Sequence, residues 1–418
     1  MTTTRLGQVV VLTVVLCAVA LSASALSAGV ARRDITPPPG GGMYGYAARG
    51  SDVSTGVHDP LLARALVLRG ETDHVVIIAL DLGNTPRDVM RDVRETVYAE
   101  TGLENLLFAA SHSHSSAAFQ RDFPSEDAPW QRDVATKISE AVCEAAENLA
   151  PARVGMGRGE VAEGHNRRVI GEDGKAEMLW ANPDRIPTSP VDHSVGVLRV
   201  ELLDDTVLAT VVNFTCHPVV LGPDNLLLSA DYPGALTARV EAAIGGQCLF
   251  VQGACGDINP FGDKTPVDEG GFEEMQRMGH AVADEVLRVS EDIAMIASDV
   301  DITFYSETLS LAPRRVRDRE RTVEAELNTV TIGDMMALAT FPGEYFVDLG
   351  LSLKARSKFP HTWFVGYCNG SLGYVPTINA YVEGGYGADF GVRVAPGAGE
   401  YNINRALINL YQQMGWLR

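Results

Sequence analysis

Two histidines separated by one residue, His112 and His114, lie in the sequence Ser-His-Ser-His-Ser at 111–115. They follow the apolar run 106–110, which is typical of a buried strand. Residues two apart in a strand share a face, so the two imidazoles are expected to project together, roughly 6–7 Å apart. Such a pair suits metal binding or proton transfer. A strand cap without chemistry explains the pair equally well, and the other histidines must decide.

Polar side chains also stand near the ends of other expected strands. These residues are His217, Asp257, Glu344 and Tyr374. Active-site residues gather on loops at one edge of a sheet. Two histidines, a carboxylate and one more oxygen are an ordinary donor set for zinc, and an open position for water makes such a site catalytic. Spacing alone does not establish the site, because these residues lie far apart along the chain.

Each candidate also has a purely structural explanation. Tyr374 can be a packed aromatic side chain. Glu344 can be a first-turn residue that the helix dipole favours. His217 can be a loop residue before a proline, and Arg167 can belong to a surface ion pair.

Strands and helices that would position these residues alternate along the chain. Strands are expected at residues 29–36, 65–69, 75–82, 106–110, 152–157, 195–202, 207–214, 248–252, 300–311, 335–341 and 363–368. Helices are expected at residues 85–102, 134–149, 233–244, 272–289 and 342–354. The tail from Gly373 is expected to form loops over a site. Without a low-complexity linker, the chain is expected to be one large α/β domain with core sheets flanked by helices.

Composition limits the possible partners. The chain has 418 residues, 46% hydrophobic and 21% charged, enough to bury a large core. Lys and Arg number 34 against 54 Asp and Glu, which gives a formal net charge of -20. This balance disfavours nucleic acids and anionic membrane surfaces as partners. The oligomeric state stays open.

Residues 1–25 have the form of an export signal. Arg5 supplies a positive start, residues 9–21 an apolar core, and residues 23–25 a small-x-small cleavage site. Residues 26–418 are therefore expected to form the mature domain, secreted or periplasmic. No later stretch is long and apolar enough to span a bilayer, so no transmembrane span is expected after signal removal. An uncleaved N-terminal anchor is the alternative.

A series of short motifs runs in order along the chain. They include 34–36 (Asp-Ile-Thr), 58–61 (His-Asp-Pro-Leu), 111–115, Asn166-Arg167, His217-Pro218, 256–260 (Gly-Asp-Ile-Asn-Pro), 342–344 (Pro-Gly-Glu) and Tyr374-Val375. Their order and spacing resemble those of the neutral ceramidase family, zinc-dependent N-acylsphingosine amidohydrolases. The pentapeptide at 111–115 is similar to the family's Thr-His-Thr-His-Ser. The resemblance implies a neutral-ceramidase-like catalytic domain.

The resemblance implies a zinc ion held by His112, His217, Glu344 and Tyr374. Zinc lowers the pKa of a bound water to near 7 and so supplies hydroxide at neutral pH. The substrate would be a small-molecule or lipid N-acyl compound, with ceramide as the leading candidate.

Four further residues take part in the implied chemistry. His114 would be the general acid/base beside the metal water. Arg167 and Tyr386 would polarise the scissile carbonyl and meet the developing oxyanion. Asp257 would hold a loop by hydrogen bonding or contact the metal water.

Three departures from the family pattern bear on the substrate. Asn259 replaces a serine of the family motif, and residues 116–119 reshape the loop beside the site. The family's C-terminal immunoglobulin-like domain and the loops lining its lipid pocket are expected to be missing or shortened. The alternatives are therefore a zinc hydrolase of a non-lipid amide or ester, such as an acylated sugar or peptide, and a catalytically decayed binding module.

Overall fold

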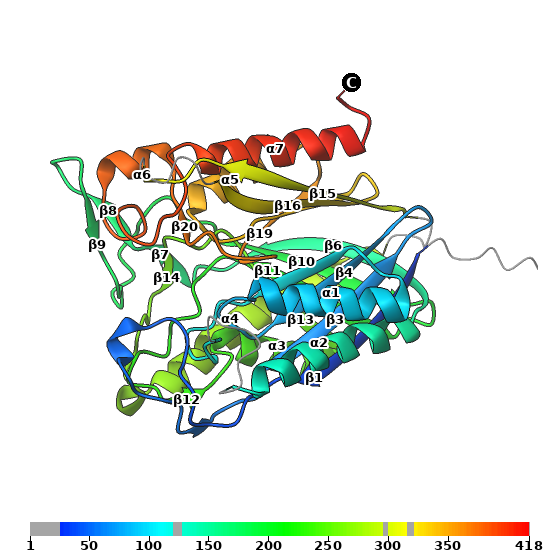
Figure 1. Ribbon diagram of the computed structural model, residues 1–418, viewed down its shortest axis with the longest axis horizontal. Coiled ribbons are helices and arrows are strands. Elements are labelled where there is room, and N and C mark those ends of the chain that lie inside the picture. Colours follow the sequence, from blue (N-terminus) through cyan, green and yellow to red (C-terminus); the bar gives the residue numbers. More distant parts are fainter. Residues whose placement is uncertain (1–25, 120–127, 296–299, 316–321, 418) are drawn as a thin grey trace, which may run out of the picture.

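The computed structural model describes residues 26–119, 128–295, 300–315 and 322–417. They form one mixed α/β domain in four layers, with helices outside and two sheets stacked between them (Figure 1). The predicted α/β fold with core sheets flanked by helices is confirmed. The predicted export signal, residues 1–25, lies outside the described residues.

The larger sheet has eight strands in the order β13-β11-β10-β6-β1-β3-β4-β5. Neighbouring strands are antiparallel except at the two edges, where β13 and β11 are parallel and so are β4 and β5. The strands are β1 (Ser27–Asp34), β3 (Leu62–Arg69), β4 (His74–Leu80), β5 (Leu106–Ala110), β6 (Ala150–Glu160), β10 (Ser194–Leu202), β11 (Val207–Phe214) and β13 (Gln247–Gln252). β3 and β4 are nearly continuous apolar runs because both of their faces are covered.

The smaller sheet has four strands in the order β15-β16-β17-β19. They are β15 (Ile302–Leu311), β16 (Val323–Ile332), β17 (Met336–Thr340) and β19 (His361–Val365). The two sheets share one buried cluster, in which Leu66 and Leu198 of the larger sheet join Val330 and Trp363 of the smaller. This shared core fixes the strand ends of one sheet against those of the other.

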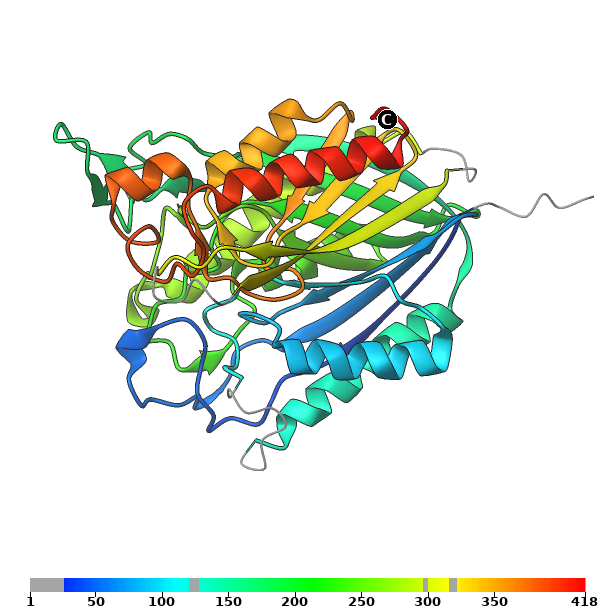
Figure 2. The same ribbon diagram turned by 45° about the horizontal axis from the view of Figure 1, so that its top comes forward.

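Helices cover the outer face of each sheet. The helices of the described chain are α1 (Arg87–Thr101), α2 (Trp130–Glu147), α3 (Tyr232–Ile244), α4 (Gly271–Asp292), α5 (Val347–Arg356), α6 (Ile378–Glu383) and α7 (Ala398–Gln413), with 3-10 turns η1 (Ala47–Arg49) and η2 (Val267–Glu269). The buried stripe of α1 and the residues of α2 pack on the larger sheet, as do those of α3 and α4. α5 and α7 cover the smaller sheet, and Figure 2 shows α7 lying along it.

Short strands frame the loops. They are β2 (Gly56–Val57), β7 (Gly164–Asn166), β8 (Arg168–Ile170), β9 (Ala176–Met178), β12 (Leu227–Leu228), β14 (Ile258–Pro260), β18 (Glu344–Tyr345) and β20 (Tyr374–Val375). β7, β8, β14 and β20 are grouped at one end of the two sheets (Figure 1). The polar loops that carry the candidate site residues therefore lie at that end.

Several predicted elements differ from the structure. The tail from Gly373 was expected to be loops, but it contains α6 and α7. The helix predicted from residue 342 begins only at Val347, so Glu344 lies in β18 and is not a first-turn residue. The helix predicted from residue 85 begins at Arg87, with Pro86 at its N-cap.

Helices long and apolar enough to cross a bilayer are absent from the described part of the chain.

Candidate metal centre

The ends of β5, β13 and β19 meet because the residues after β19 hydrogen-bond to both edge strands of the larger sheet. Gly366 N–H donates to the carbonyl of Gln252, the last residue of β13, over 2.8 Å. Ala110 N–H, at the end of β5, donates to the carbonyl of Tyr367 over 3.2 Å. The smaller sheet thus draws the strand ends of the larger sheet to one place.

His112 and His114 come together through a turn and not through the pleat of a strand. β5 ends at Ala110, and His112 has a φ of 70°, in the left-handed region that non-glycine residues seldom adopt. The predicted reason for their proximity, alternation along a strand, is therefore wrong. The turn still brings the two Nε2 atoms to 3.3 Å from each other.

Backbone carbonyls orient two of the three histidines in the cluster. His112 Nδ1 lies 2.7 Å from the carbonyl oxygen of Gly83, and His217 Nδ1 lies 3.1 Å from that of Ile258. A carbonyl oxygen only accepts, so in each ring Nδ1 donates its proton and Nε2 presents a lone pair. Both rings are buried.

Glu344 brings a carboxylate to these lone pairs. In the parallel pair of β18 and β20, Glu344 lies opposite Tyr374. Its Oε2 lies 3.4 Å from His112 Nε2 and 3.3 Å from His217 Nε2. Ligand atoms about 2.0–2.1 Å from a tetrahedral zinc lie about 3.3 Å from one another. The separations therefore fit a single shared divalent ion.

The charge state of the cluster also suits a cation. Burial and the neighbouring histidines lower the pKa of His114 well below its ordinary value. Burial lowers the pKa of His217 to about 4. Burial alone would raise the pKa of Glu344, but His112 and His217 hold it well below its usual range. A carboxylate and buried imidazoles thus face one another, and a metal ion would satisfy them.

His114 differs from the other two histidines. One nitrogen from each of His112, His114 and His217 lies within 4.8 Å of the others, so the three form a candidate metal site. Among the described residues, however, His114 Nδ1 has no hydrogen-bond partner although it is buried. Its ring packs edge-on against Tyr44 and Tyr46. No carbonyl of the described chain fixes which of its nitrogens carries the proton.

The aromatic wall around the histidines was missed in the sequence. The ring of Tyr367 stacks on His112 with centroids 4.1 Å apart, and Tyr44 meets His112 edge-on. The glycine-rich run at 40–45 held the one available signal. At Gly45, where φ is 95°, a Cβ would lie 2.3 Å from the His114 ring, so only glycine allows this approach.

Arg167 is buried in the same region, which excludes a surface ion pair. Its Nη1 donates to Asn259 Oδ1 over 2.9 Å, and its Nη2 donates to the carbonyl of Gly256 over 2.6 Å. Nη2 also lies 3.2 Å from the hydroxyl of Tyr374. Trp180, which was not predicted, faces the guanidinium at 5.3 Å. No periodic pattern in its polar loop marks that tryptophan.

The two predicted site tyrosines lie side by side. Tyr374 is 7% exposed and Tyr386 is 40% exposed, with ring centroids 5.4 Å apart. The guanidinium of Arg167 is 5.2 Å from the centre of the Tyr386 ring. The structure thus joins Tyr386 to Arg167 and Tyr374, and Tyr374 to Glu344.

Asp257 uses both of its oxygens within the protein. Oδ1 accepts from the N–H of Val347 over 2.7 Å, and Oδ2 accepts from Asn166 Nδ2 over 3.0 Å. Burial raises its pKa to about 6 despite these hydrogen bonds. The carboxyl group therefore ties the start of α5 to the loop that carries Arg167.

A cavity of about 780 Å³ opens beside Glu344 and Tyr374. Its other lining residues are Tyr44, Asn84, Pro313, Arg314, Arg315, Thr322, Val323, Ser371, Gly373, Gly391, Val392 and Arg393. We call it the metal-side cavity. Few of these side chains are aliphatic, and three are arginines.

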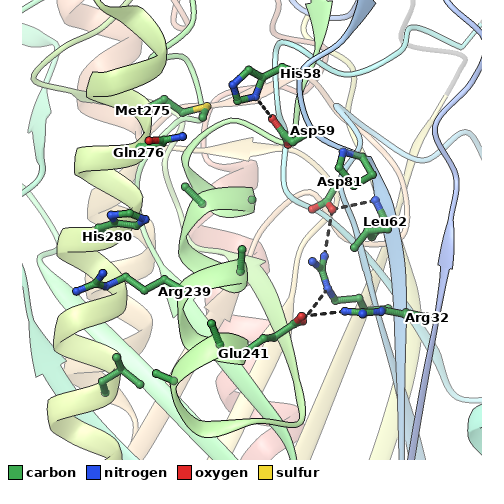
Figure 3. A pocket seen from close by; sticks show the side chains of 18 residues that line it. Arg32, His58, Asp59, Leu62, Asp81, Arg239, Glu241, Met275, Gln276 and His280 are labelled. Carbon is green, nitrogen blue, oxygen red and sulfur yellow. Dashed lines mark hydrogen bonds and ion pairs between the residues drawn. The ribbon is translucent and has the colours of Figure 1, made fainter.

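A second cavity, of about 980 Å³, lies between the larger sheet and helices α3 and α4 (Figure 3). We call it the helix-side cavity. His58 and Asp59 lie at one end of it, with His58 Nδ1 and Asp59 Oδ1 2.6 Å apart. Its lining includes none of the predicted site residues.

Solved structures share this fold. The neutral ceramidase from Pseudomonas aeruginosa is 18% identical, with a TM-score of 0.74 over 93% of this chain and 75% of that one. A structure described as a ceramidase complexed with C2 is 16% identical, with a TM-score of 0.75 over 93% of this chain and 76% of that one. These similarities define the class of fold, an α/β domain of the ceramidase type.

The sequence narrows this class to a family. The pattern of the neutral/alkaline non-lysosomal ceramidases, N-terminal part, matches residues 26–260, and this chain belongs to that family. The resemblance inferred from the motifs is thereby confirmed.

Proposed function

We propose that this chain is a secreted, zinc-dependent amidohydrolase that cleaves an N-acyl bond. The family supports an amide hydrolase. The observation that carries the proposal is the position of Glu344 Oε2, at tetrahedral separations from His112 Nε2 and His217 Nε2. Export is supported only by the sequence of residues 1–25.

His112, His217 and Glu344 would hold the ion, with Tyr374 as the fourth ligand. Metal-bound histidines generally donate their second nitrogen to a carbonyl or carboxylate, as His112 and His217 do here. Burial and the charge of Glu344 raise the pKa of Tyr374 well above its ordinary value, so its phenolate would need a nearby cation. When bound, zinc supplies the charge that lowers the pKa of a water to near 7.

His114 would move the proton. Its imidazole accepts a proton from the attacking water and passes it to the leaving nitrogen as the C–N bond breaks. The products are a carboxylate and an amine. A positioned histidine of this kind contributes about 10²–10⁴-fold. The unpartnered Nδ1 of His114 supports this role over that of a ligand, because His112 and His217 instead donate their Nδ1 protons to carbonyls, as metal-bound histidines generally do.

Arg167 would stabilise the carbonyl oxygen as it gains charge, together with Tyr386. A guanidinium has five N–H donors, and the three hydrogen bonds of Arg167 leave one Nη1–H and the buried Nε–H without a partner. Asn259, which replaces the family serine, supports Arg167 directly. Asp257 is assigned to positioning, since both of its oxygens accept hydrogen bonds within the protein.

Metal analysis of the purified protein tests the centre. We expect about one zinc per chain and expect His112→Ala to lose both the zinc and the amidase activity. His280→Ala is the matched control, because His280 lies in the helix-side cavity. Absence of zinc from protein prepared without chelators, or full activity of His112→Ala, would refute the proposal.

Substrate choice needs a separate panel. Ceramide is the candidate that the family suggests, and a non-lipid amide or ester is the alternative. The polar lining of the metal-side cavity favours the alternative, because two long hydrocarbon chains need apolar walls. Turnover of soluble N-acyl compounds without turnover of long-chain ceramide would select it. Zinc binding without turnover of any acyl compound would indicate a decayed binding module.

A further inference from the structure

Main-chain pairing ties the arginines of the metal-side cavity to the metal centre. Glu344 pairs with Tyr374, and Val392 forms bridges to Gly373 and Tyr374. The next residue, Arg393, accepts a hydrogen bond at its carbonyl from the N–H of Arg314 over 2.8 Å. Neighbouring strands lie about 4.8 Å apart, so the Arg393 backbone is two steps, roughly 10 Å, from that of Glu344.

Two of the three arginines are exposed and uncommitted. Within the described chain, the side chains of Arg315 and Arg393 form no hydrogen bond or ion pair. Arg314 is different, because it donates to the carbonyl of Ala388, approaches Asp389 to 3.9 Å and lies over Tyr381. The cavity therefore has two guanidinium groups available for a ligand.

The positive charge of the metal-side cavity contrasts with the negative charge of the whole chain. The chain as a whole carries a net charge of -20, yet among the described residues Glu344 is the one acidic residue that lines the metal-side cavity. Under the proposed function that carboxylate is bound to the metal ion, which leaves the cavity positively charged. A cleft lined by one sign of charge concentrates ligands of the opposite sign.

We infer that the substrate carries an anionic group, which Arg315 and Arg393 bind while its N-acyl bond lies at the metal centre. The inference rests on the proposed function and narrows its substrate class. A guanidinium presents a planar pair of donors that matches a carboxylate or a phosphate. An N-acyl amino acid or a peptide with a free carboxylate meets this requirement. Ceramide, which has no formal charge, does not.

Equilibrium binding tests the inference without turnover. The probes are N-acetyl and N-decanoyl glycine, their neutral glycinamide counterparts, and N-decanoyl phosphoethanolamine, titrated by calorimetry into the zinc-loaded His114→Ala variant. We expect the anionic probes to bind at least roughly tenfold more tightly than the neutral ones, as charge-assisted hydrogen bonds provide. Raising the salt concentration should reduce this preference. Whichever of the carboxylate and phosphate probes binds more tightly identifies the anion that the site prefers.

Variants test whether the two arginines are responsible. In the same background, Arg315→Ala with Arg393→Ala should abolish the preference and leave the affinity for the neutral probes within about twofold. Arg393→Lys should keep part of the preference for anionic probes, because lysine retains the charge but not the paired donors. Arg132→Ala, an exposed arginine of α2, is the matched control and should change nothing.

Each outcome decides the inference. Equal affinities for charged and neutral probes, failure to bind any probe, or a preference that survives the double substitution would overturn it. The proposed function fails separately, when wild-type enzyme hydrolyses neither these probes nor ceramide. A charge preference in binding with no hydrolysis of the probes or of ceramide would thus keep the anion site and reject the amidase.

Discussion

The helix-side cavity is larger than the metal-side cavity, about 980 against 780 Å³, but its charged groups are already paired. Arg32 and Arg64 both reach Glu241, at 2.8 and 3.5 Å, and Arg64 also binds Asp81 at 3.1 Å. Figure 3 marks the ion pair between Arg32 and Glu241 with a dashed line.

In the metal-side cavity, by contrast, several charged groups have no partner of opposite charge in the part of the chain that the structure describes. Glu344 faces the lone pairs of two histidines, and Arg315 and Arg393 have no side-chain partner in the described residues. Charges that satisfy one another stabilise the fold, whereas charges left without a partner are ready for a ligand. The difference teaches that charge without a partner, more than volume, sets apart the cavity proposed to be functional. Substitutions in the first cavity should therefore affect stability, and those in the second should affect activity.

The largest effect is expected at Glu344. Glu344→Gln removes the only carboxylate of the proposed ligand set and should lower kcat/KM at least about a thousandfold, since a metal ion supplies several kcal/mol of charge stabilisation. Metal analysis should find little zinc, and circular dichroism should be unchanged. Retained zinc with full activity would place the ion elsewhere.

His114→Gln should separate a proton carrier from a ligand. If His114 moves the proton, kcat falls about 10²–10⁴-fold while zinc content stays near that of the wild type. Zinc analysis and steady-state kinetics on one sample measure both. Loss of zinc would instead make the three-histidine cluster the metal site and remove His114 from the acid/base role.

The helix-side cavity should respond through stability. Arg64 and Asp81 have side chains that are 5% and 6% exposed, and removal of one partner of a buried pair costs about 3–5 kcal/mol. We therefore expect Arg64→Met to lower the free energy of unfolding by this amount near neutral pH, measured by chemical denaturation. Amidase activity of the folded fraction should be unchanged.

The loss of stability in Arg64→Met should depend on pH, and the direction of that dependence can be predicted. Burial raises the pKa of Asp81 above 3.8, and Arg64 partly offsets it. A raised carboxyl pKa means that the folded state binds the proton more tightly, so stability falls as pH rises above about 3.8. Without Arg64 the pKa rises further, and the penalty of Arg64→Met should shrink as the pH is lowered from 7 towards 5. A penalty independent of pH would contradict this account.

The smallest effect is expected from Arg393→Ala on stability. Its side chain is exposed and unpaired within the described chain, so the free energy of unfolding should change by less than about 0.5 kcal/mol. A loss of several kcal/mol would mean that this arginine is structural, and the contrast between the two cavities would disappear.

The sequence predicted the elements whose patterns are local. The run 106–110 is β5, and residues 195–202 and 207–214 include nearly all of β10 and β11. β16 is absent from the predicted strands, although Val323, Ala325 and Leu327 alternate with polar residues.

The helix α7 was missed for a physical reason. Its glycine and asparagines have low helix propensity, and tertiary contacts override this. Asn402 donates to the hydroxyl of Tyr345, and Asn409 donates to Glu307 over 2.6 Å. Such contacts join residues far apart in the chain, so no local pattern reveals them.

The candidate site shows the same limit. The motifs named His112, His217 and Glu344, and these do converge. Trp180 and the free arginines of the metal-side cavity belong to no motif. The places of these arginines depend on how β20 and residues 391–394 align, which only the folded chain determines.

The pairing of Glu344 with Tyr374, and of Tyr374 with Val392 beside Arg393, could separate two tasks that a hydrolase must perform. On these proposals, the strand of Glu344 would carry the groups that the chemistry needs, and the segment of Arg393 would carry the groups that select the substrate. A relative could exchange residues 393 and 315 for apolar ones and keep the same backbone and the same reaction. A few substitutions could then change the preferred substrate from a charged to an apolar amide, while the residues that cleave the bond stay the same.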